Sequence, residues 1–222
     1  MRFHLIIPSS GTGSRFGSRL PKQYLKIGGK EIIVHSILKF TSIREINSIY
    51  IAARKEQFGR IQELVTKYNL GTKEIFLVEG GKTRQHSVFN ALNLMKSSKN
   101  EFVIVHDAVR PYVKTSLIRK CIEAAVKYKC SVPCTVSSDT VKISEKNLFI
   151  KETIPRECIF LAQTPQIFRL DILKKSYNYA FRKGFKGTDD SSVVEYAGYK
   201  VKIIEGDREN TKITTVHDLK NF

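Results

Sequence analysis

The chain has 222 residues, of which 41% are hydrophobic. This is enough apolar material for one substantial core, and the chain is too short for two full-sized domains. The formal net charge of +17 favours anionic partners, but no stripe interleaves the cations with aromatic residues, so the charge alone does not indicate nucleic-acid binding. We therefore expect a single domain, residues 1–222, with no nucleic acid among its partners.

The cysteines and the first residues exclude further classes of protein. Cys121, Cys130, Cys134 and Cys158 include no C-x-x-C pair, and no spaced set of histidines and cysteines predicts structural zinc. Strand-like sequence begins at Arg2, which leaves no room for a signal peptide, and no apolar run approaches membrane-spanning length. We expect a cytoplasmic protein with reduced thiols and no membrane partner.

Strand-like and helix-like segments alternate through the first two thirds of the chain. Apolar, β-branched runs predict strands at residues 3–8, 48–53, 74–78, 102–106, 131–136 and 201–205. Apolar residues spaced three and four apart predict helices at residues 32–40, 57–68, 84–95 and 116–128. This alternation predicts an α/β fold, a Rossmann-like, mostly parallel twisted sheet flanked by helices. Ligands then bind at the carboxyl ends of the strands.

Residues 137–154 interrupt this rhythm. They are polar and charged, with apolar residues at Val141, Ile143, Leu148 and Ile150. The pattern predicts an exposed hairpin, a β-arm at about residues 137–156 that projects from the sheet. An arm of this kind usually needs a partner surface.

The loop at residues 8–23 carries the most specific local signal. It follows the first predicted strand and contains three glycines, several hydroxyl residues and three cations. Backbone N–H groups in such a loop are suited to surrounding a polyphosphate. Arg15 and Lys22 lie within the loop, and Pro21 stiffens the approach to Lys22. We interpret both cations as phosphate contacts rather than as solvated loop residues.

Two familiar glycine motifs are ruled out by their spacing. The first loop reads G-x-G-x-x-x-G, and no acidic residue follows about 20 positions later, so a dinucleotide-binding fingerprint is excluded. Residues 80–83 read G-G-K-T, but Phe76 stands where a P-loop requires its first glycine. This turn fits either a plain strand-to-helix connection or a contact to a nucleotide base.

Acidic and basic residues follow two other predicted strands. Asp107 comes directly after residues 102–106, and beside a phosphate loop we interpret it as a magnesium ligand, although an aspartate there also caps turns. Glu209 and Lys212 follow the last strand and add a second acid and another cation. Two acids suit Mg²⁺, which keeps several waters and takes few protein carboxylates. His106 fits a hydrogen-bonded histidine at a strand end rather than a catalytic group.

Two further polar groups are candidates for an anionic second substrate. Arg156 ends the arm, and Thr188 precedes a helix predicted at residues 191–197. Thr188 or Asp189 also fits the N-cap of that helix.

Six motifs, taken together and in order, resemble the 2-C-methyl-D-erythritol 4-phosphate cytidylyltransferase family. They are G-x-G-x-R followed by Pro21-Lys22-Gln23-Tyr24, then Gly80-Gly81, His106-Asp107-Ala108-Val109-Arg110-Pro111, Gln163-Thr164-Pro165-Gln166, Thr188-Asp189-Asp190 and Glu209-Asn210-Thr211-Lys212. The resemblance spans the chain from the first strand to the last dozen residues. It implies transfer of the cytidylyl group of CTP to methylerythritol phosphate, with Mg²⁺ and release of pyrophosphate, in the non-mevalonate route to isoprenoid precursors.

The resemblance also implies roles for individual residues. The catalytic cations are Arg15, Lys22 and Lys212. The nucleotide contacts are Ser10, Gly11, Gly13, Gly81, Ser87 and Ala108. The contacts to the polyol phosphate are Asp107, Arg110, Thr140, Arg156, Thr164 and Thr188, and the metal-associated acids are Asp107 and Glu209. In the family the arm residues come from the neighbouring subunit, which implies a homodimer.

The chain departs from the family pattern at a few positions, and two other functions fit parts of the sequence. Ser9 and Ser10 replace small apolar residues, Val109 replaces a common alanine, and Glu209 stands where many members carry aspartate. Thr211 replaces an aliphatic residue. A cytidylyltransferase for ribitol 5-phosphate shares the fold and the H-D-A-V-R-P motif. A basic nucleic-acid-binding protein is the alternative that the net charge suggests.

Overall fold

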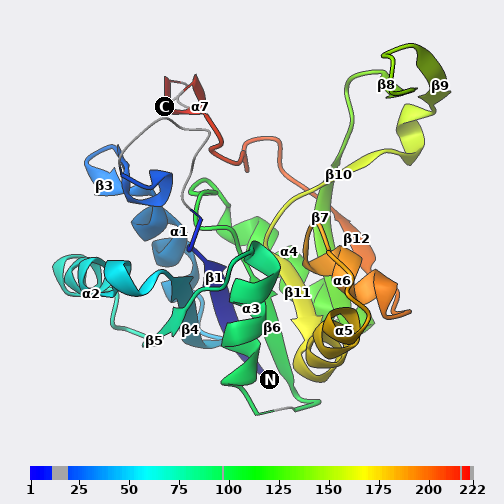
Figure 1. Ribbon diagram of the computed structural model, residues 1–222. Coiled ribbons are helices and arrows are strands. Elements are labelled where there is room, and N and C mark those ends of the chain that lie inside the picture. Colours follow the sequence, from blue (N-terminus) through cyan, green and yellow to red (C-terminus); the bar gives the residue numbers. More distant parts are fainter. Residues whose placement is uncertain (12–19, 97, 216, 221–222) are drawn as a thin grey trace.

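The computed structural model describes residues 1–11, 20–96, 98–215 and 217–220, which form a central sheet with helices on both faces (Figure 1). The order of the main strands is β10 (Phe160–Ala162), β7 (Cys130–Val136), β11 (Gln166–Arg169), β6 (Glu101–Val105), β1 (Arg2–Pro8), β4 (Ile46–Ala53) and β5 (Glu74–Glu79). β12 (Lys202–Glu205) pairs with β7. The pairs β1–β4, β1–β6, β4–β5 and β7–β12 are parallel. The predicted α/β fold with a mostly parallel sheet is confirmed.

Two sets of helices cover the two faces of the sheet. α1 (Ile32–Thr41), α2 (Phe58–Lys67) and α4 (Thr115–Tyr128) pack on one face, and α3 (Arg84–Asn93), α5 (Leu170–Arg182) and α6 (Asp190–Tyr196) pack on the other. A short helix, α7 (His217–Lys220), follows near the end of the chain. Leu5 and Ile7 of β1 belong to the first core, and Ile6 belongs to the second. A strand buried on both faces is nearly continuous in apolar residues, and the buried part of β1, Leu5 to Ile7, fits this rule.

The strands and helices predicted from periodicity lie within two residues of their observed bounds. β11 and α5 are additions that the periodicity did not predict. β11 is antiparallel to β6 and to β7, so it separates the parallel part of the sheet from its far edge. β11 has only four residues, so its pattern is too brief to stand out in a sequence.

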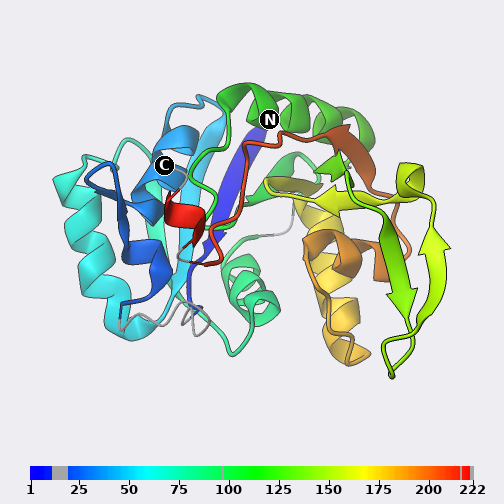
Figure 2. The ribbon, with the colours of Figure 1, turned by 90° about the horizontal axis from the view of Figure 1, so that it is seen from above.

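Two hairpins lie outside the main sheet. The smaller pairs β2 (Lys26–Ile27) with β3 (Lys30–Glu31). The larger pairs β8 (Val141–Ser144) with β9 (Ile150–Ile154), and it projects from the body of the molecule (Figures 1 and 2). The predicted arm is therefore present as a hairpin. Its role in dimerisation stays a prediction.

The chain after β12 returns across the carboxyl ends of the strands to α7 (Figure 1). The backbone N–H of Ile213 donates to the carbonyl oxygen of Val109 at 2.9 Å, which anchors this segment beside the end of β6. The crossing brings residues near the end of the chain to the strand edge where ligands are expected.

Candidate functional site

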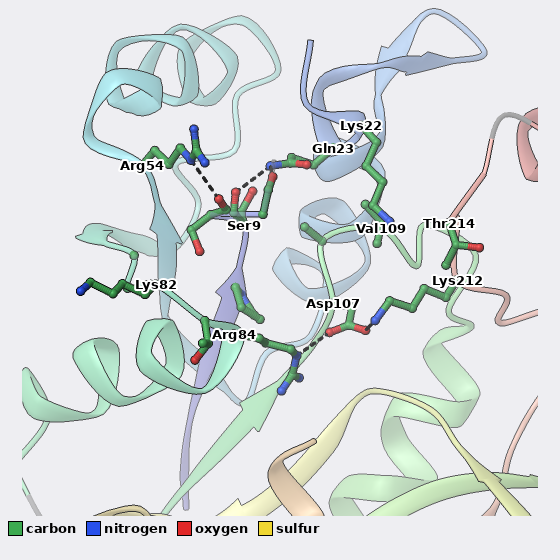
Figure 3. Close-up of a pocket in the computed structure, with 17 residues that line it drawn as sticks. Ser9, Lys22, Gln23, Arg54, Lys82, Arg84, Asp107, Val109, Lys212 and Thr214 are labelled. Carbon is green, nitrogen blue, oxygen red and sulfur yellow. Dashed lines mark hydrogen bonds and ion pairs between the residues drawn. The ribbon is translucent and has the colours of Figure 1, made fainter. Parts of the chain in front are cut away.

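A cavity of about 670 Å³ opens at the carboxyl ends of β1, β5 and β6. Its walls come from four separate stretches of the chain: residues 8–11, residues 80–84, residues 107–109 and the C-terminal Lys212 and Thr214 (Figure 3). Lys22, Gln23 and Arg54 complete the lining. The pocket lies where an open α/β sheet places its ligands.

The start of the first loop is tied down by side chains. Gln23 Nε2 donates to the carbonyl oxygens of Ser9 at 2.7 Å and Gly11 at 3.1 Å. Arg54 Nε donates to the carbonyl oxygen of Ser10 at 3.2 Å. The loop therefore enters the pocket with its carbonyl groups held on protein donors. Gly13, an expected nucleotide contact, and Arg15, an expected catalytic cation, lie outside the described residues.

The turn between β5 and α3 packs closely against the first loop. Ser10 Oγ and Ser87 Oγ are hydrogen-bonded at 2.7 Å, and the backbone N–H of Gly81 donates to Ser87 Oγ at 3.1 Å. A Cβ atom on Gly80 would lie 2.4 Å from the Cβ of Ser10, so this approach requires glycine. The structure thus brings together Ser10, Gly81 and Ser87, three of the expected nucleotide contacts.

Two lysines link the C-terminal segment to the rest of the pocket, one to the first loop and one to the end of β6. Lys22 Nζ donates to the carbonyl oxygen of Ile213 at 2.8 Å. Lys212 Nζ lies 2.8 Å from Oδ2 of Asp107 (Figure 3). Both lysines line the pocket, as the sequence analysis expected of its catalytic cations.

Asp107 is the carboxylate that lines the pocket among the described residues. Arg84 Nε lies 3.0 Å from its Oδ1, and Arg110 Nε lies 3.9 Å from its Oδ2. Burial would raise the pKa of Asp107, but the charges of Arg84, Lys212 and Arg110 outweigh it and hold the pKa well below its ordinary value. Asp107 is therefore ionised in the folded protein throughout the neutral range.

Arg84 is a pocket residue that the sequence analysis missed. It is the first residue of α3, and its guanidinium contacts Asp107 on one side and Asp190 on the other. The available signal was its position directly after the glycine turn at residues 80–83, where a helix N-terminus meets a ligand site.

Two expected substrate contacts, Thr164 and Arg110, lie behind the pocket wall. Thr164 Oγ1 accepts the backbone N–H of Asp107 at 3.1 Å and lies 3.0 Å from Nδ1 of His106. Nε2 of His106 lies 3.1 Å from the carbonyl oxygen of Arg110, which only accepts, so the proton sits on Nε2. Arg110 Nη1 donates to the carbonyl oxygen of Asn210 at 2.6 Å. These bonds fix the end of β6, where Asp107 and Ala108 enter the pocket.

His106 is a buried, hydrogen-bonded histidine, as predicted. Its side chain is fully buried, and this burial lowers its pKa to about 4. The ring is therefore neutral at neutral pH, and both of its nitrogens are engaged in hydrogen bonds within the protein.

The remaining expected contacts lie away from the pocket. Glu209 is 72% exposed and pairs with Lys114 at 2.7 Å. Thr140 and Arg156 are exposed on the arm, and Thr188 is exposed in the loop before α6. Asp189 caps α6, since its side chain accepts the backbone N–H of Ser192, so the N-cap interpretation is confirmed.

The donor set of the pocket fits a magnesium ion that arrives with a nucleotide. The described residues contain no cluster of three or more His, Cys, Asp or Glu side chains that would hold a metal by themselves. Within the part of the chain that the structure describes, Asp107 is the one carboxylate of the pocket. Mg²⁺ commonly takes one or two protein carboxylates and fills its other positions with water and phosphate oxygens, so one carboxylate is compatible with that ion.

Comparison with known proteins shows what this pocket is related to. The family model for 2-C-methyl-D-erythritol 4-phosphate cytidylyltransferase (IspD) matches residues 3–221. The chain belongs to this family.

Individual relatives match over nearly the whole chain. The 2-C-methyl-D-erythritol 4-phosphate cytidylyltransferase of Geobacillus thermodenitrificans is 35% identical over 219 residues, which cover 99% of this chain and 94% of the relative. That of Thermosipho africanus is 38% identical over 216 residues, or 96% and 93% of the two chains. The crystal structure of 4-diphosphocytidyl-2C-methyl-D-erythritol synthase from Anaerococcus prevotii superposes with a TM-score of 0.87 at 31% identity, covering 99% and 93%.

Family membership makes the chain an enzyme, a cytidylyltransferase of isoprenoid biosynthesis. The ribitol 5-phosphate alternative is not favoured, because these relatives carry the methylerythritol phosphate name. Among the described residues, no helix is long and apolar enough to cross a membrane.

Proposed function

We propose that the pocket at the ends of β1, β5 and β6 binds CTP with Mg²⁺ and transfers the cytidylyl group to 2-C-methyl-D-erythritol 4-phosphate, releasing pyrophosphate. One observation carries the proposal: among the described residues, five cations line the pocket against a single carboxylate. The cations are Lys22, Arg54, Lys82, Arg84 and Lys212, and the carboxylate is Asp107. This excess of positive charge suits two phosphorylated ligands that must approach each other.

The reaction needs positioning and charge compensation more than covalent chemistry. An oxygen of the polyol phosphate attacks the α-phosphorus of CTP in line, and the bond to the pyrophosphate group breaks. In this proposal Lys22, which lines the pocket at the end of the first loop, neutralises the triphosphate. Lys212, which contacts Asp107, holds the incoming phosphate. Holding two anions in register converts an unfavourable encounter into an intramolecular step.

Asp107 is the residue that would hold the magnesium ion. When bound, the ion would neutralise charge on the phosphate oxygens. Glu209 pairs with Lys114 at 2.7 Å, and it does not line this pocket. A second acidic contact from Glu209 would require that side chain to leave Lys114.

The base is expected beside the turn between β5 and α3. Ser10, Gly81, Ser87 and Ala108 surround this side of the pocket or support its wall. Ser87 Oγ donates to the carbonyl oxygen of Thr83 at 3.0 Å, so its position is fixed before a nucleotide arrives. A rigid polar edge of this kind discriminates between bases by their hydrogen-bonding groups.

The second substrate site is completed by the arm of another subunit in this proposal. Thr140 and Arg156 lie on the arm, away from the pocket of their own chain. At the tip of the arm, Leu148 is 84% exposed and Phe149 is 71% exposed. Exposure of large apolar side chains to water is unfavourable, and adjacent exposed apolar residues are typical of an interaction surface. A homodimer would cover these residues and deliver Arg156 to the partner's polyol phosphate.

The direct test measures pyrophosphate release from Mg²⁺, CTP and either methylerythritol phosphate or ribitol 5-phosphate. We expect turnover with CTP and methylerythritol phosphate, and far less with UTP or ATP in place of CTP. Faster turnover with ribitol 5-phosphate would overturn the choice of acceptor. Salt-sensitive binding to nucleic acid without any CTP turnover would overturn the proposed function itself.

A further inference from the structure

Three side chains form a line that starts at the pocket and ends in the core. Arg84 places Nε 3.0 Å from Oδ1 of Asp107 and Nη2 2.7 Å from Oδ2 of Asp190. The hydroxyl of Tyr177 donates to Oδ1 of Asp190 at 2.5 Å. The side chains of Asp190 and Tyr177 are fully buried, whereas Arg84 lines the pocket. The guanidinium therefore bridges a carboxylate at the site and a carboxylate beneath it.

The start of α6 is anchored on several sides, so the Asp190 carboxylate has a defined place. The backbone N–H of Ser191 donates to Oε1 of Gln166 at 2.9 Å, and Nε2 of Gln166 donates to Oδ2 of Asp189 at 2.7 Å. The residue after Arg84, Gln85, binds the loop before α6, because its Nε2 donates to the carbonyl oxygen of Phe185 at 3.1 Å. The two ends of the Arg84–Asp190 contact are thus held at a fixed separation.

Tyr177 serves this arrangement as a hydrogen-bond donor. Burial raises its pKa well above the ordinary value, so its hydroxyl stays protonated. A neutral hydroxyl that donates to a buried carboxylate satisfies an oxygen that would otherwise lack a partner. With Oδ1 occupied by Tyr177, Asp190 presents Oδ2 to Arg84.

The Arg84–Asp107 contact affects how tightly Asp107 holds the ammonium group of Lys212. Among the described residues, Asp107 has two close cationic partners, Lys212 on Oδ2 and Arg84 on Oδ1. If Arg84 turned away, Lys212 would be the cation of this described pair that stays within 3 Å of Asp107, and its ammonium would be held there more tightly. With Arg84 in place, Lys212 can exchange from Asp107 to an incoming phosphate at a lower cost.

We propose that Asp190, supported by Tyr177, is a positioning residue that orients the Arg84 guanidinium toward Asp107 and thereby frees Lys212 for the second substrate. The inference rests on the proposed function and deepens it. It assigns a task to the second aspartate of the Thr188-Asp189-Asp190 motif, a fully buried residue that does not line the pocket.

The first test compares Asp190→Asn, Tyr177→Phe and the wild-type chain. Turnover is measured at saturating CTP and methylerythritol phosphate and divided by the number of CTP-binding sites, which calorimetric titration counts. We expect kcat per site to fall on the order of 10²-fold in Asp190→Asn, as for a displaced catalytic group, and by less in Tyr177→Phe. Asp171→Asn is the matched control, because Asp171 is a buried aspartate paired with Arg169 at 2.6 Å away from the pocket.

A merely structural role gives a different result. It would lower activity and the number of CTP-binding sites together, so that kcat per site would stay at the wild-type value in both variants. That outcome overturns the inference while leaving the proposed function intact. A wild-type chain without turnover would instead overturn the proposed function, and the inference with it.

A double-mutant cycle then shows whether Asp190 acts through Arg84. Arg84→Lys keeps the charge but removes the fork that spans two carboxylates. If Asp190 acts by orienting Arg84, adding Asp190→Asn to Arg84→Lys lowers kcat per site by much less than it does in the wild-type background. Equal effects in the two backgrounds would contradict the proposed coupling.

Discussion

The pocket and the arm are built in opposite ways. The pocket joins residues far apart in the sequence, such as Lys212 with Asp107 and Ser10 with Ser87. The arm pairs β8 with β9 and leaves the side chains at its tip exposed. Buried polar groups must find partners within the chain, whereas the exposed groups of the arm are solvated. The pocket is therefore assembled within one chain, whereas the side chains at the tip of the arm remain exposed.

The largest expected effect is at the pocket, in Lys22→Ala. Removing this cation leaves the triphosphate charge less compensated, so we expect turnover to fall on the order of 10²–10³-fold. The fold should survive, because the Lys22 side chain lines the pocket rather than the core. Steady-state pyrophosphate release measures the loss, and circular dichroism checks the fold.

Lys26→Ala is the matched control for this prediction. Lys26 is a more exposed lysine four residues later, 4.0 Å from Glu31, and it does not line the pocket. Near-normal turnover in Lys22→Ala would remove the assignment of the pocket as the reaction site.

The second prediction concerns the arm, in Arg156→Ala. Loss of a charged hydrogen bond to the acceptor phosphate should reduce kcat/KM for methylerythritol phosphate by roughly 10–100-fold. The apparent affinity for CTP should change little, because the arm does not line the nucleotide pocket. Lys146→Ala, which removes an exposed cation near the tip of the same arm, is the control.

Mixing the two impaired variants distinguishes an arm that works in another subunit from one that works in its own. A heterodimer of Lys22→Ala and Arg156→Ala chains would contain one site with both groups intact. Random exchange of subunits should restore about a quarter of the wild-type activity. If the mixture shows only the mean activity of the two separate variants while light scattering shows mixed dimers, the arm does not complete the partner's site.

The smallest effect is expected for Glu209→Gln. Glu209 is exposed and paired with Lys114, and such surface pairs contribute little. The magnesium concentration that gives half-maximal turnover should stay within about twofold of the wild-type value. A large increase would show that Glu209 leaves Lys114 and contacts the metal during the reaction. Asp107→Asn, which changes the carboxylate in the pocket, supplies the contrasting variant.

Local sequence patterns were sufficient to predict the features that depend on residues close together in the chain. Apolar runs located β1 and β6, three- and four-residue spacing located the helices around them, and Asp189 was foreseen as a helix cap. The projecting hairpin also followed from its own alternation. Each of these features is decided within a few residues, so a sequence displays it directly.

The partners of the charged groups were decided only by the tertiary structure. Asp107 was identified as a site residue, but its pairing with Arg84, 23 residues earlier, depends on how α3 packs beside β6. Asp190 stood in a recognised motif without a role until the packing of α5 and α6 placed it between Tyr177 and Arg84. The pairing of Glu209 with Lys114 likewise depends on the tertiary structure, because the two residues lie far apart in the sequence. Close ion pairs form only between groups that the fold brings within about 4 Å, and spacing along the chain does not reveal such contacts.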